Sequence, residues 1–370
     1  MKAKFLCIVI LAMTAFTAIN SQVLYRKAIN IPDIQGYLTL KADFHIHTVF
    51  SNGLVWPTIR VQEAWMEGLD VIAFTDHLEY HTFDKDVVYD DNRAIEIAKP
   101  YAQMYGMVLI KGTEITRSQP LGHFNAIFTT DNNKLRVKDS ILSITTAGQQ
   151  GAFITWNHPH ENNKGWNEVQ EMLFKQGLMN GIEVANHNTY FPEAQQWCMD
   201  KNLTMMGTSD VHNPITFDYN FQKGEHRTLT LVFAKEKTPE SIREALNNHR
   251  TAAYWKDKII GKEEFLSEIF KNSVSFLNTT VTINKKNKIK AVLYIRNSSD
   301  IPYKIKLTEK PADITIPTEI LLEPGKTSAI DFDGKTPGQK QYALAFEVTN
   351  LLVGPNKPYV SSVTLTVVNQ

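Results

Sequence analysis

Between residues 38 and 233, short apolar runs alternate with longer segments that carry apolar residues at helical spacing. The apolar runs predict strands at Leu38–His45, Val71–Phe74, Met107–Thr113, Phe124–Thr129, Gly151–Thr155, Gly181–Val184, Thr204–Thr208 and Thr228–Phe233. The intervening segments predict helices at Thr58–Glu67, Asp90–Tyr105, Lys138–Gln149, Trp166–Gln176, Phe191–Asp200 and, with proline at its start, Pro239–Asn248. Such alternation is typical of a parallel α/β barrel or sheet.

The pattern changes after about residue 267, where short apolar runs are separated by Pro, Gly and Asn turns. Strands are predicted at Val281–Ile283, Ile289–Ile295, Tyr303–Leu307, Ser328–Phe332, Tyr342–Val348 and Ser361–Val367. A series of strands with no helix between them indicates a small antiparallel β-sandwich. We therefore expect a barrel domain at residues 35–266 and a β-sandwich domain at residues 275–370.

The first residues differ from both domains. Lys2 and Lys4 precede an almost wholly apolar or small stretch from Phe5 to Ile19. This layout predicts a signal peptide over residues 1–21 and a periplasmic or secreted protein, with an uncleaved anchor helix as the alternative. Removal of the segment would leave Cys198 as the one cysteine, so neither an internal disulfide nor a thiolate metal cluster is expected.

The charge balance limits the classes of partner. Lys and Arg together number 39, and Asp and Glu together also number 39. No overall basic field is therefore present to attract nucleic acid, and no membrane contact is expected beyond the signal peptide.

Ligand-type side chains gather where the predicted strands end or begin. They are His45, His47, His77, Glu114, His123, His158, Asp210 and His212. In a parallel barrel the carboxyl ends of the strands converge on one face, where active sites are built. Imidazoles and carboxylates without thiolates suit Zn, Mn or Fe, so the set predicts a metal centre.

The motifs around these residues resemble those of the PHP (polymerase and histidinol phosphatase) family. The matching stretches are His45-Ile46-His47-Thr48, Thr75-Asp76-His77, Gly112-Thr113-Glu114, His123, Asn157-His158-Pro159 and Ser209-Asp210-Val211-His212. The resemblance implies a distorted (β/α)7 TIM-like barrel and a metal-dependent phosphoesterase. The β domain after the barrel is similar to the architecture of secreted phosphodiesterase members.

The resemblance also implies two to three divalent metal ions. His45, His47, Glu114 and Asp210 would hold the first ion, and a bridging Glu114 would share the second with His123 and His158. His77 and His212 would hold a third. The family has an acidic residue where this chain has Asn52, so occupancy of the third site is an open question.

Two bridged ions would generate hydroxide at neutral pH and clamp the phosphoryl oxygens. Glu114, Asp210 and His212 are the predicted catalytic residues, the latter two because they could accept or return a proton. Arg227, Arg117 and His187 are candidates for substrate binding, with a solvated loop position as the alternative for each. Asp43 and Asp76 could orient the imidazoles.

Small-molecule phosphate esters, diesters before monoesters, are the predicted substrates. The alternatives are a phosphomonoesterase of the histidinol-phosphatase type and an amidohydrolase-like enzyme that acts on a non-phosphate bond. A DNA-proofreading nuclease is disfavoured because the chain has no polymerase domain and no basic stripe. A non-catalytic binding protein is disfavoured by the near-complete ligand set.

Overall fold

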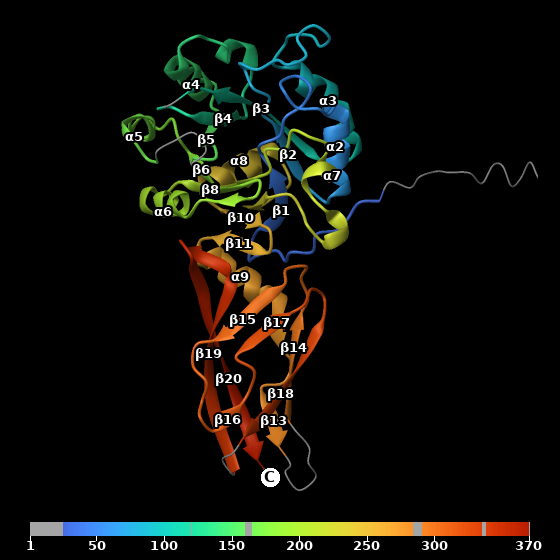
Figure 1. The fold of residues 1–370 in the computed structure, drawn as a ribbon, viewed down its shortest axis with the longest axis vertical. Helices are drawn as coiled ribbons and strands as arrows, with labels where there is room; N and C mark the ends of the chain where they lie inside the picture. Colours follow the sequence, from blue (N-terminus) through green and yellow to red (C-terminus); the bar gives the residue numbers. More distant parts are fainter. Residues whose placement is uncertain (1–24, 119, 160–164, 284–290, 335–337, 370) are drawn as a thin grey trace, which may run out of the picture.

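The computed structural model describes residues 25–118, 120–159, 165–283, 291–334 and 338–369. The predicted signal peptide lies outside these ranges. Figure 1 shows an α/β body above and an elongated all-β body below. The predicted combination of an α/β barrel and a β-sandwich is confirmed, and its details explain where the site is built.

The barrel wall contains both parallel and antiparallel strands. Six described strands run in the same direction: β1 (Leu38–Asp43), β2 (Val71–Phe74), β3 (Val108–Thr116), β5 (Phe153–Trp156), β6 (Gly181–Asn186) and β8 (Thr204–Thr208). β4 (His123–Ile127) and β9 (Leu229–Ala234) run antiparallel to their neighbours. The expectation of parallel strands throughout is therefore corrected for these two.

Side-chain bonds join β8 to β9. The Gly207 amide donates to Thr230 Oγ1 at 3.0 Å, and that hydroxyl donates to the Gly207 carbonyl at 2.7 Å. A Cβ atom at position 207 would lie 2.6 Å from the Leu229 carbonyl oxygen, so this close approach requires glycine.

The predicted helices form on the outside of the barrel within three residues of their expected bounds. They are α2 (Pro57–Met66), α3 (Arg93–Met104), α4 (Ser140–Gln149), α5 (Glu168–Lys175), α6 (Pro192–Lys201) and α8 (Pro239–Asn247). Local sequence explains α8: the Thr238 hydroxyl caps the Ser241 amide and Pro239 occupies the first turn. Short elements lie in the loops: η1 (Asn132–Leu135), β7 (Thr189–Tyr190), α7 (Ile215–Asp218) and η2 (Phe221–Lys223).

Three elements after α8 were not predicted. The hairpin of β10 (Thr251–Trp255) and β11 (Lys258–Gly261) extends the sheet beyond β9, and α9 (Glu263–Ser273) leads into the sandwich. Both strands are short, and β10 begins with the small residues Thr251, Ala252 and Ala253, so their apolar signal is weak.

The sandwich packs two sheets against each other. One contains β12 (Val274–Phe276), β14 (Ala291–Asn297), β18 (Thr327–Gly334) and β16 (Ile314–Thr315). The other contains β13 (Thr280–Ile283), β20 (Lys357–Asn369), β19 (Gly338–Gly354), β15 (Tyr303–Leu307) and β17 (Glu319–Leu322). Strict alternation of buried and exposed residues in β15 shows one face on the core and one in solvent.

The β19–β20 hairpin is longer than predicted because its tip packs against the barrel (Figure 1). Leu351 and Leu352 pair in parallel with Ile259 and Ile260 of β11. Leu352 is 4% exposed within a cluster of barrel side chains that includes Ile260, and its carbonyl accepts from Gln195 of α6 at 3.1 Å. Backbone pairing and apolar packing thus join the two domains. No helix among the described residues is long and apolar enough to cross a membrane.

Leu352→Ala tests this junction. Because Leu352 is buried among barrel side chains, we expect the free energy of unfolding to fall by about 2–4 kcal/mol in chemical denaturation. Leu321→Ala is the matched control, since Leu321 is 48% exposed and should change stability by less than about 0.5 kcal/mol. Equal losses in both variants would contradict the proposed contribution of the hairpin tip.

Candidate metal centre

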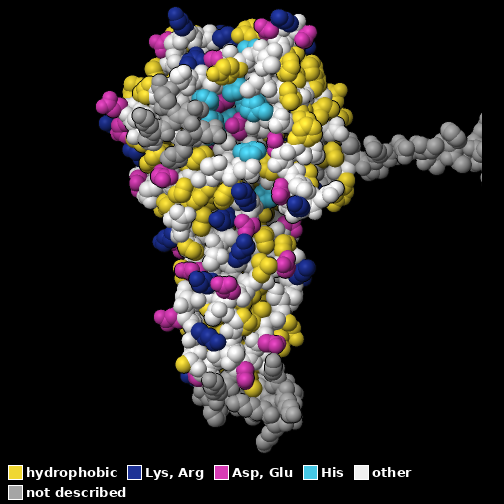
Figure 2. All heavy atoms as spheres, viewed as in Figure 1, with side chains coloured by type: hydrophobic (Ala, Val, Ile, Leu, Met, Phe, Trp, Pro, Cys, Tyr) yellow, Lys and Arg dark blue, Asp and Glu magenta, His cyan; other side chains and the backbone are white. Residues whose placement is uncertain are grey.

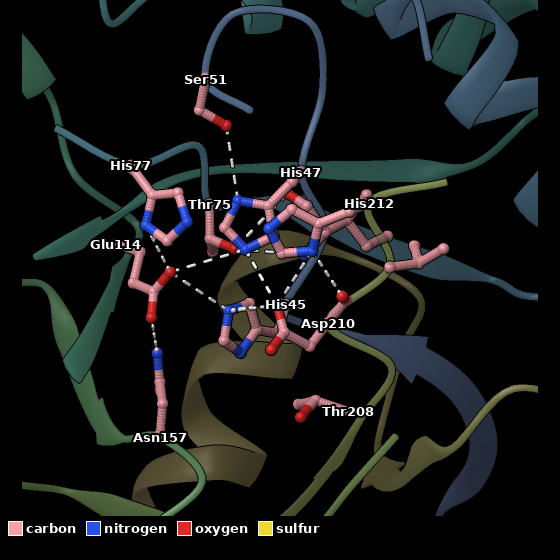
Figure 3. A network of polar contacts seen from close by, with 12 residues as sticks. His45, His47, Ser51, Thr75, His77, Glu114, Asn157, Thr208, Asp210 and His212 are labelled. Carbon is pink, nitrogen blue, oxygen red and sulfur yellow. Dashed lines mark hydrogen bonds and ion pairs between the residues drawn. The ribbon is translucent and has the colours of Figure 1, made fainter. Parts of the chain in front are cut away.

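The barrel strands bring all eight predicted ligand residues to one face. His45 and His47 follow β1, and Asp210 and His212 follow β8. Figure 3 shows the imidazoles of this region turned toward the carboxylates of Glu114 and Asp210. His123 stands at the start of β4, and it reaches the same face because β4 runs antiparallel.

Asp210 and Glu114 face the first histidine pair. Asp210 Oδ1 lies 3.2 Å from His45 Nε2 and 3.0 Å from His47 Nε2. Glu114 Oε2 lies 3.5 Å from each of the same two nitrogen atoms. The four residues expected at a first ion therefore lie together.

Glu114 faces a second group with its other oxygen. Glu114 Oε1 lies 3.1 Å from His123 Nδ1 and 3.7 Å from His158 Nε2. One ligand atom from each of these three residues lies within 4.8 Å of the others. Because its two oxygens face different histidine pairs, Glu114 has the geometry of a bridge.

A third group contains His77, His212 and also His47. The His47 ring centroid lies 4.4 Å from that of His77 and 4.0 Å from that of His212. Asn52 borders the site, and its side-chain oxygen is buried without a hydrogen-bond partner among the described residues. The Asn52 oxygen is therefore available as a neutral ligand beside this group.

The donor set fits metal ions. His45 Nε2, His47 Nε2 and Glu114 Oε2 are buried, and in the described part of the chain they face one another and Asp210 at ion-pair distances without a hydrogen bond of good geometry. Unsatisfied buried polar atoms are costly, and here they converge from separate strands. Coordination of divalent cations would satisfy them.

The electrostatics of the protein without ions keep the carboxylates charged. Burial opposes ionisation of Glu114, but the nearby His77 and His45 lower its pKa well below the usual range. Burial likewise opposes ionisation of Asp210, and His45 and His47 outweigh it, so the pKa of Asp210 is also lowered. Both side chains are therefore deprotonated, as metal ligation requires.

The imidazoles divide into two kinds. Burial and the nearby His77 and His212 lower the pKa of His47. Burial also disfavours the charged form of His158, but its contact with the Glu114 carboxylate and the charge of Asp210 raise its pKa to about 9. The pKa of His45 is raised too, because Asp210, Glu183 and Glu114 outweigh its burial. Some imidazoles must therefore release a proton when metal binds.

Sequence reasoning missed Glu183. This fully buried residue of β6 accepts bonds from His45 Nδ1 at 2.7 Å and from the His158 amide at 2.7 Å. The Thr208 hydroxyl donates to the same carboxylate at 2.6 Å. The bond to Nδ1 fixes the His45 tautomer and turns Nε2 toward the centre. A lone acidic residue inside an apolar strand was the available signal.

Two polar residues tie the ligand-bearing loops together. Asp76 accepts from the Thr48 amide at 2.6 Å and from the Ser51 hydroxyl at 2.7 Å, so it orders the loop after His47. Arg60 is fully buried and donates to the carbonyls of His47 at 2.9 Å and His212 at 2.7 Å. It therefore joins the loop after β1 to the loop after β8.

Backbone geometry marks two ligands. Asp210 has a φ of 53° and His158 has a φ of 25°, a region that residues other than glycine rarely adopt. Such conformations are retained where the surroundings fix the backbone, which here is at the metal centre.

Arg227 does not reach the centre, which corrects its prediction as a substrate ligand. Its side chain is 1% exposed and pairs with Asp43 Oδ2 at 3.0 Å and with Glu67 Oε2 at 2.9 Å. Asp43 in turn accepts from the Ser209 hydroxyl at 2.5 Å. Arg227 and Asp43 thus form a buried network beneath the site, and Asp43 contacts the backbone amide of His45 rather than its ring.

The other two substrate candidates also lie apart from the ligands. Arg117 pairs with Glu79 and donates to Ser140 Oγ at 3.0 Å and the Val137 carbonyl at 3.0 Å, so its guanidinium is already engaged. Phosphate binding by Arg117 stays a prediction. His187 lines a separate cavity toward the C-terminal domain. Cys198 is buried, as expected of a packing residue.

A small opening gives access to the ligands. The metal cavity, as we name it, has a volume of about 290 Å³ and is lined by Asn52, His77, Tyr80, Glu114, His123, His158, Asp210 and His212. Figure 2 shows the histidine side chains gathered on one face of the barrel with acidic side chains between them. The centre is therefore open to a ligand from solvent.

Comparisons with known proteins agree with this site. A family model described as an Ig-like domain matches residues 274–364. A crystal structure from Bacteroides vulgatus, described as a two-domain protein containing a predicted PHP-like metal-dependent phosphoesterase, is 45% identical. That alignment covers 92% of this chain and 99% of the other, with a TM-score of 0.86.

A second crystal structure, from Bifidobacterium adolescentis, is named provisionally as a metal-dependent phosphoesterase. It is 16% identical, and the alignment covers 48% of this chain and 89% of the other, with a TM-score of 0.37. No curated protein sequence matches the chain. On the Bacteroides vulgatus similarity, this chain belongs to the family of two-domain proteins that contain a PHP-like metal-dependent phosphoesterase.

Proposed function

We propose that the protein is an exported phosphodiesterase that hydrolyses small-molecule phosphate diesters. The observation that carries the preference for diesters is the charge of the metal cavity. No lysine or arginine is among its described lining residues, and Arg227 and Arg117 are paired elsewhere. A diester carries one negative charge, whereas a monoester carries up to two and usually recruits a cationic side chain.

The described residues divide the work among themselves. One ion would be held by His45, His47, Glu114 and Asp210. A second would be held by Glu114, His123 and His158. A third would be held by His77 and His212, together with His47 and Asn52. Bound ions supply Lewis acidity toward phosphoryl oxygens and acidify water at neutral pH.

Proton transfer falls to the more accessible ligands. The Asp210 side chain is 19% exposed, whereas that of Glu114 is 1% exposed, so Asp210 is the better placed to exchange a proton with substrate or solvent. His212 is 29% exposed, and its Nδ1 bonds to the Asp210 carbonyl at 2.8 Å. Its Nε2 is thereby left either to hold the third ion or, when that ion is absent, to donate a proton to the departing alkoxide.

Export rests on the sequence alone. The basic start and the apolar stretch from Phe5 to Ile19 support removal of residues 1–21 and a periplasmic or secreted location. N-terminal sequencing of the protein purified from cells tests this proposal. We expect the chain to begin near Ser21. An intact Met1 on soluble protein would contradict it.

The central experiment measures metal content and activity together. We expect two or more divalent ions per chain by mass spectrometry, and faster hydrolysis of a p-nitrophenyl diester than of p-nitrophenyl phosphate. Faster monoester hydrolysis would favour the histidinol-phosphatase type of activity. Bound metal without cleavage of either ester would favour an amidohydrolase-like reaction.

Glu114→Ala and Asp210→Ala should each abolish activity while the protein stays folded. Removal of a direct ligand should cost more than the 10- to 100-fold typical of loss of an outer partner. Activity, metal stoichiometry and circular dichroism are measured together. Glu240→Ala, on the exposed start of α8, is the control and should behave as wild type. Full turnover in either ligand variant would overturn the assignment of the centre.

Glu183→Gln should weaken metal binding by about 10- to 100-fold because the His45 ring loses its carboxylate partner. Competition with a chromogenic chelator gives the metal affinity, and the unfolding curve shows whether the barrel is intact. Unchanged affinity in a stable variant would show that Glu183 does not orient His45.

The chelated protein should lose stability between about pH 6.5 and pH 9. The folded pKa of His158 is about 9, above its ordinary value, so its contribution is complete below about pH 6.5 and disappears as pH rises through 9. His45 acts in the same direction, and the lowered pKa values of Glu114 and Asp210 leave their contributions constant over this range. The His158 loss is at most about 3 kcal/mol. Denaturant titrations at both pH values measure it, and an equal loss in His158→Asn would contradict the assignment.

A further inference from the structure

One described side chain of the metal cavity has no part in holding ions. The other lining residues are all assigned to ions above, and they are Asn52, His77, Glu114, His123, His158, Asp210 and His212. The remaining residue, Tyr80, lies in the loop after β2 and is 53% exposed. Its ring is therefore the part of the described lining that is open to the organic part of a substrate.

The Tyr80 ring packs against a ligand residue. Its centroid lies 5.2 Å from that of His77, and the two ring planes are nearly perpendicular, at 85°. The His77 ring in turn lies 5.9 Å from that of His212 and 6.5 Å from that of His123. Tyr80 thus borders the metal centre directly. The contact with His77 still leaves about half of Tyr80 accessible to a further ring.

The loop that carries Tyr80 is held on both sides. Glu79 accepts a hydrogen bond from the Thr116 amide at 3.0 Å, which ties the loop to the end of β3. The Thr82 amide donates to the Ser51 carbonyl at 3.0 Å, which ties the loop to the segment after β1. Because this backbone is already fixed, a ligand that packs against Tyr80 loses little free energy in ordering the loop.

The size of the metal cavity directs part of a diester toward Tyr80. Pockets that enclose small molecules usually have volumes of about 300–1,000 Å³. The metal cavity, at about 290 Å³, would have to hold the ions and the phosphate. One alcohol group of a diester would therefore extend to the opening, where the exposed Tyr80 ring lies. Figure 2 shows hydrophobic side chains at the border of the histidine group.

The chemistry of this ring favours one kind of alcohol group. Aromatic side chains bury apolar area and form offset-stacked or edge-to-face contacts with other rings. A cationic alcohol group would instead be repelled by ions held at the neighbouring His77. An aromatic alcohol group gains from the ring and meets no such repulsion.

We propose that Tyr80 is a specificity-determining residue whose ring packs against an aromatic alcohol group of the substrate while the phosphate occupies the metal centre. This inference rests on the proposed phosphodiesterase function and names its substrate class, which is diesters with at least one aromatic alcohol. It places recognition of the organic group in the loop after β2.

Phenylphosphonate and methylphosphonate test the inference by calorimetry on the metal-loaded full chain. They share the phosphonate group, lack an ester bond and differ in the ring alone. We expect the ratio of phenyl to methyl affinity to be about 3- to 10-fold higher in wild type and in Tyr80→Phe than in Tyr80→Ala. Tyr101→Ala, at an exposed tyrosine of α3, is the matched control and should keep the wild-type ratio.

The ratio separates recognition of the ring from a general change in the metal centre, because loss of ions in Tyr80→Ala would weaken both phosphonates alike. A ratio that Tyr80→Ala leaves unchanged would overturn the inference. An equal fall in Tyr80→Phe would also overturn it, since the effect would then belong to the hydroxyl. The same holds if neither phosphonate binds to wild type.

Cleavage of the p-nitrophenyl esters decides the proposed function separately. If neither ester is cleaved, that function fails, and the phosphonate ratio still decides whether Tyr80 recognises an aromatic group. If the diester is cleaved and the ratio does not respond to Tyr80→Ala, the diesterase function stands and the inference fails.

Discussion

The constraint on which this structure depends is the burial of two carboxylates among six imidazoles. Glu114 and Asp210 stay charged because the histidines around them outweigh the cost of burial. The negative carboxylates in turn stabilise the protonated imidazoles that lie close to one another. The arrangement is stable only if every ring is held at a fixed orientation, since small rotations would bring like charges together. Glu183 holds the His45 ring, and Asp76 and Arg60 hold the loops that carry His47 and His212.

Much of the centre could be predicted from the sequence because barrel strands deliver their carboxyl ends to one face. That rule alone places five of the ligands at the site, with no knowledge of contacts between distant residues. They are His45, His47, Glu114, His158 and Asp210. The position of His123 required the direction of β4, which an apolar run does not encode. Because β4 is antiparallel to β3 and β5, the start of β4 lies at the same face as the ends of those two strands.

The residues predicted wrongly or missed share a dependence on partners far away in the sequence. Arg227 resembles a phosphate ligand until Glu67, 160 positions earlier, is found beside it. Glu183 looks like an interruption of a buried strand until His45 is brought to it from 138 positions away. The long β19–β20 hairpin was underestimated because its tip is buried by the barrel rather than by its own domain. Periodicity along the chain cannot reveal any of these pairings.

The parallel pairing of β11 with β19 has a consequence for the evolution and handling of the barrel. Without the C-terminal domain, the outer edge of β11 would present unpaired amides and carbonyls next to an apolar surface. Exposed edges of that kind join the strands of other molecules and promote aggregation. The β-sandwich therefore covers an edge that would otherwise promote aggregation, and the barrel expressed without it is expected to aggregate.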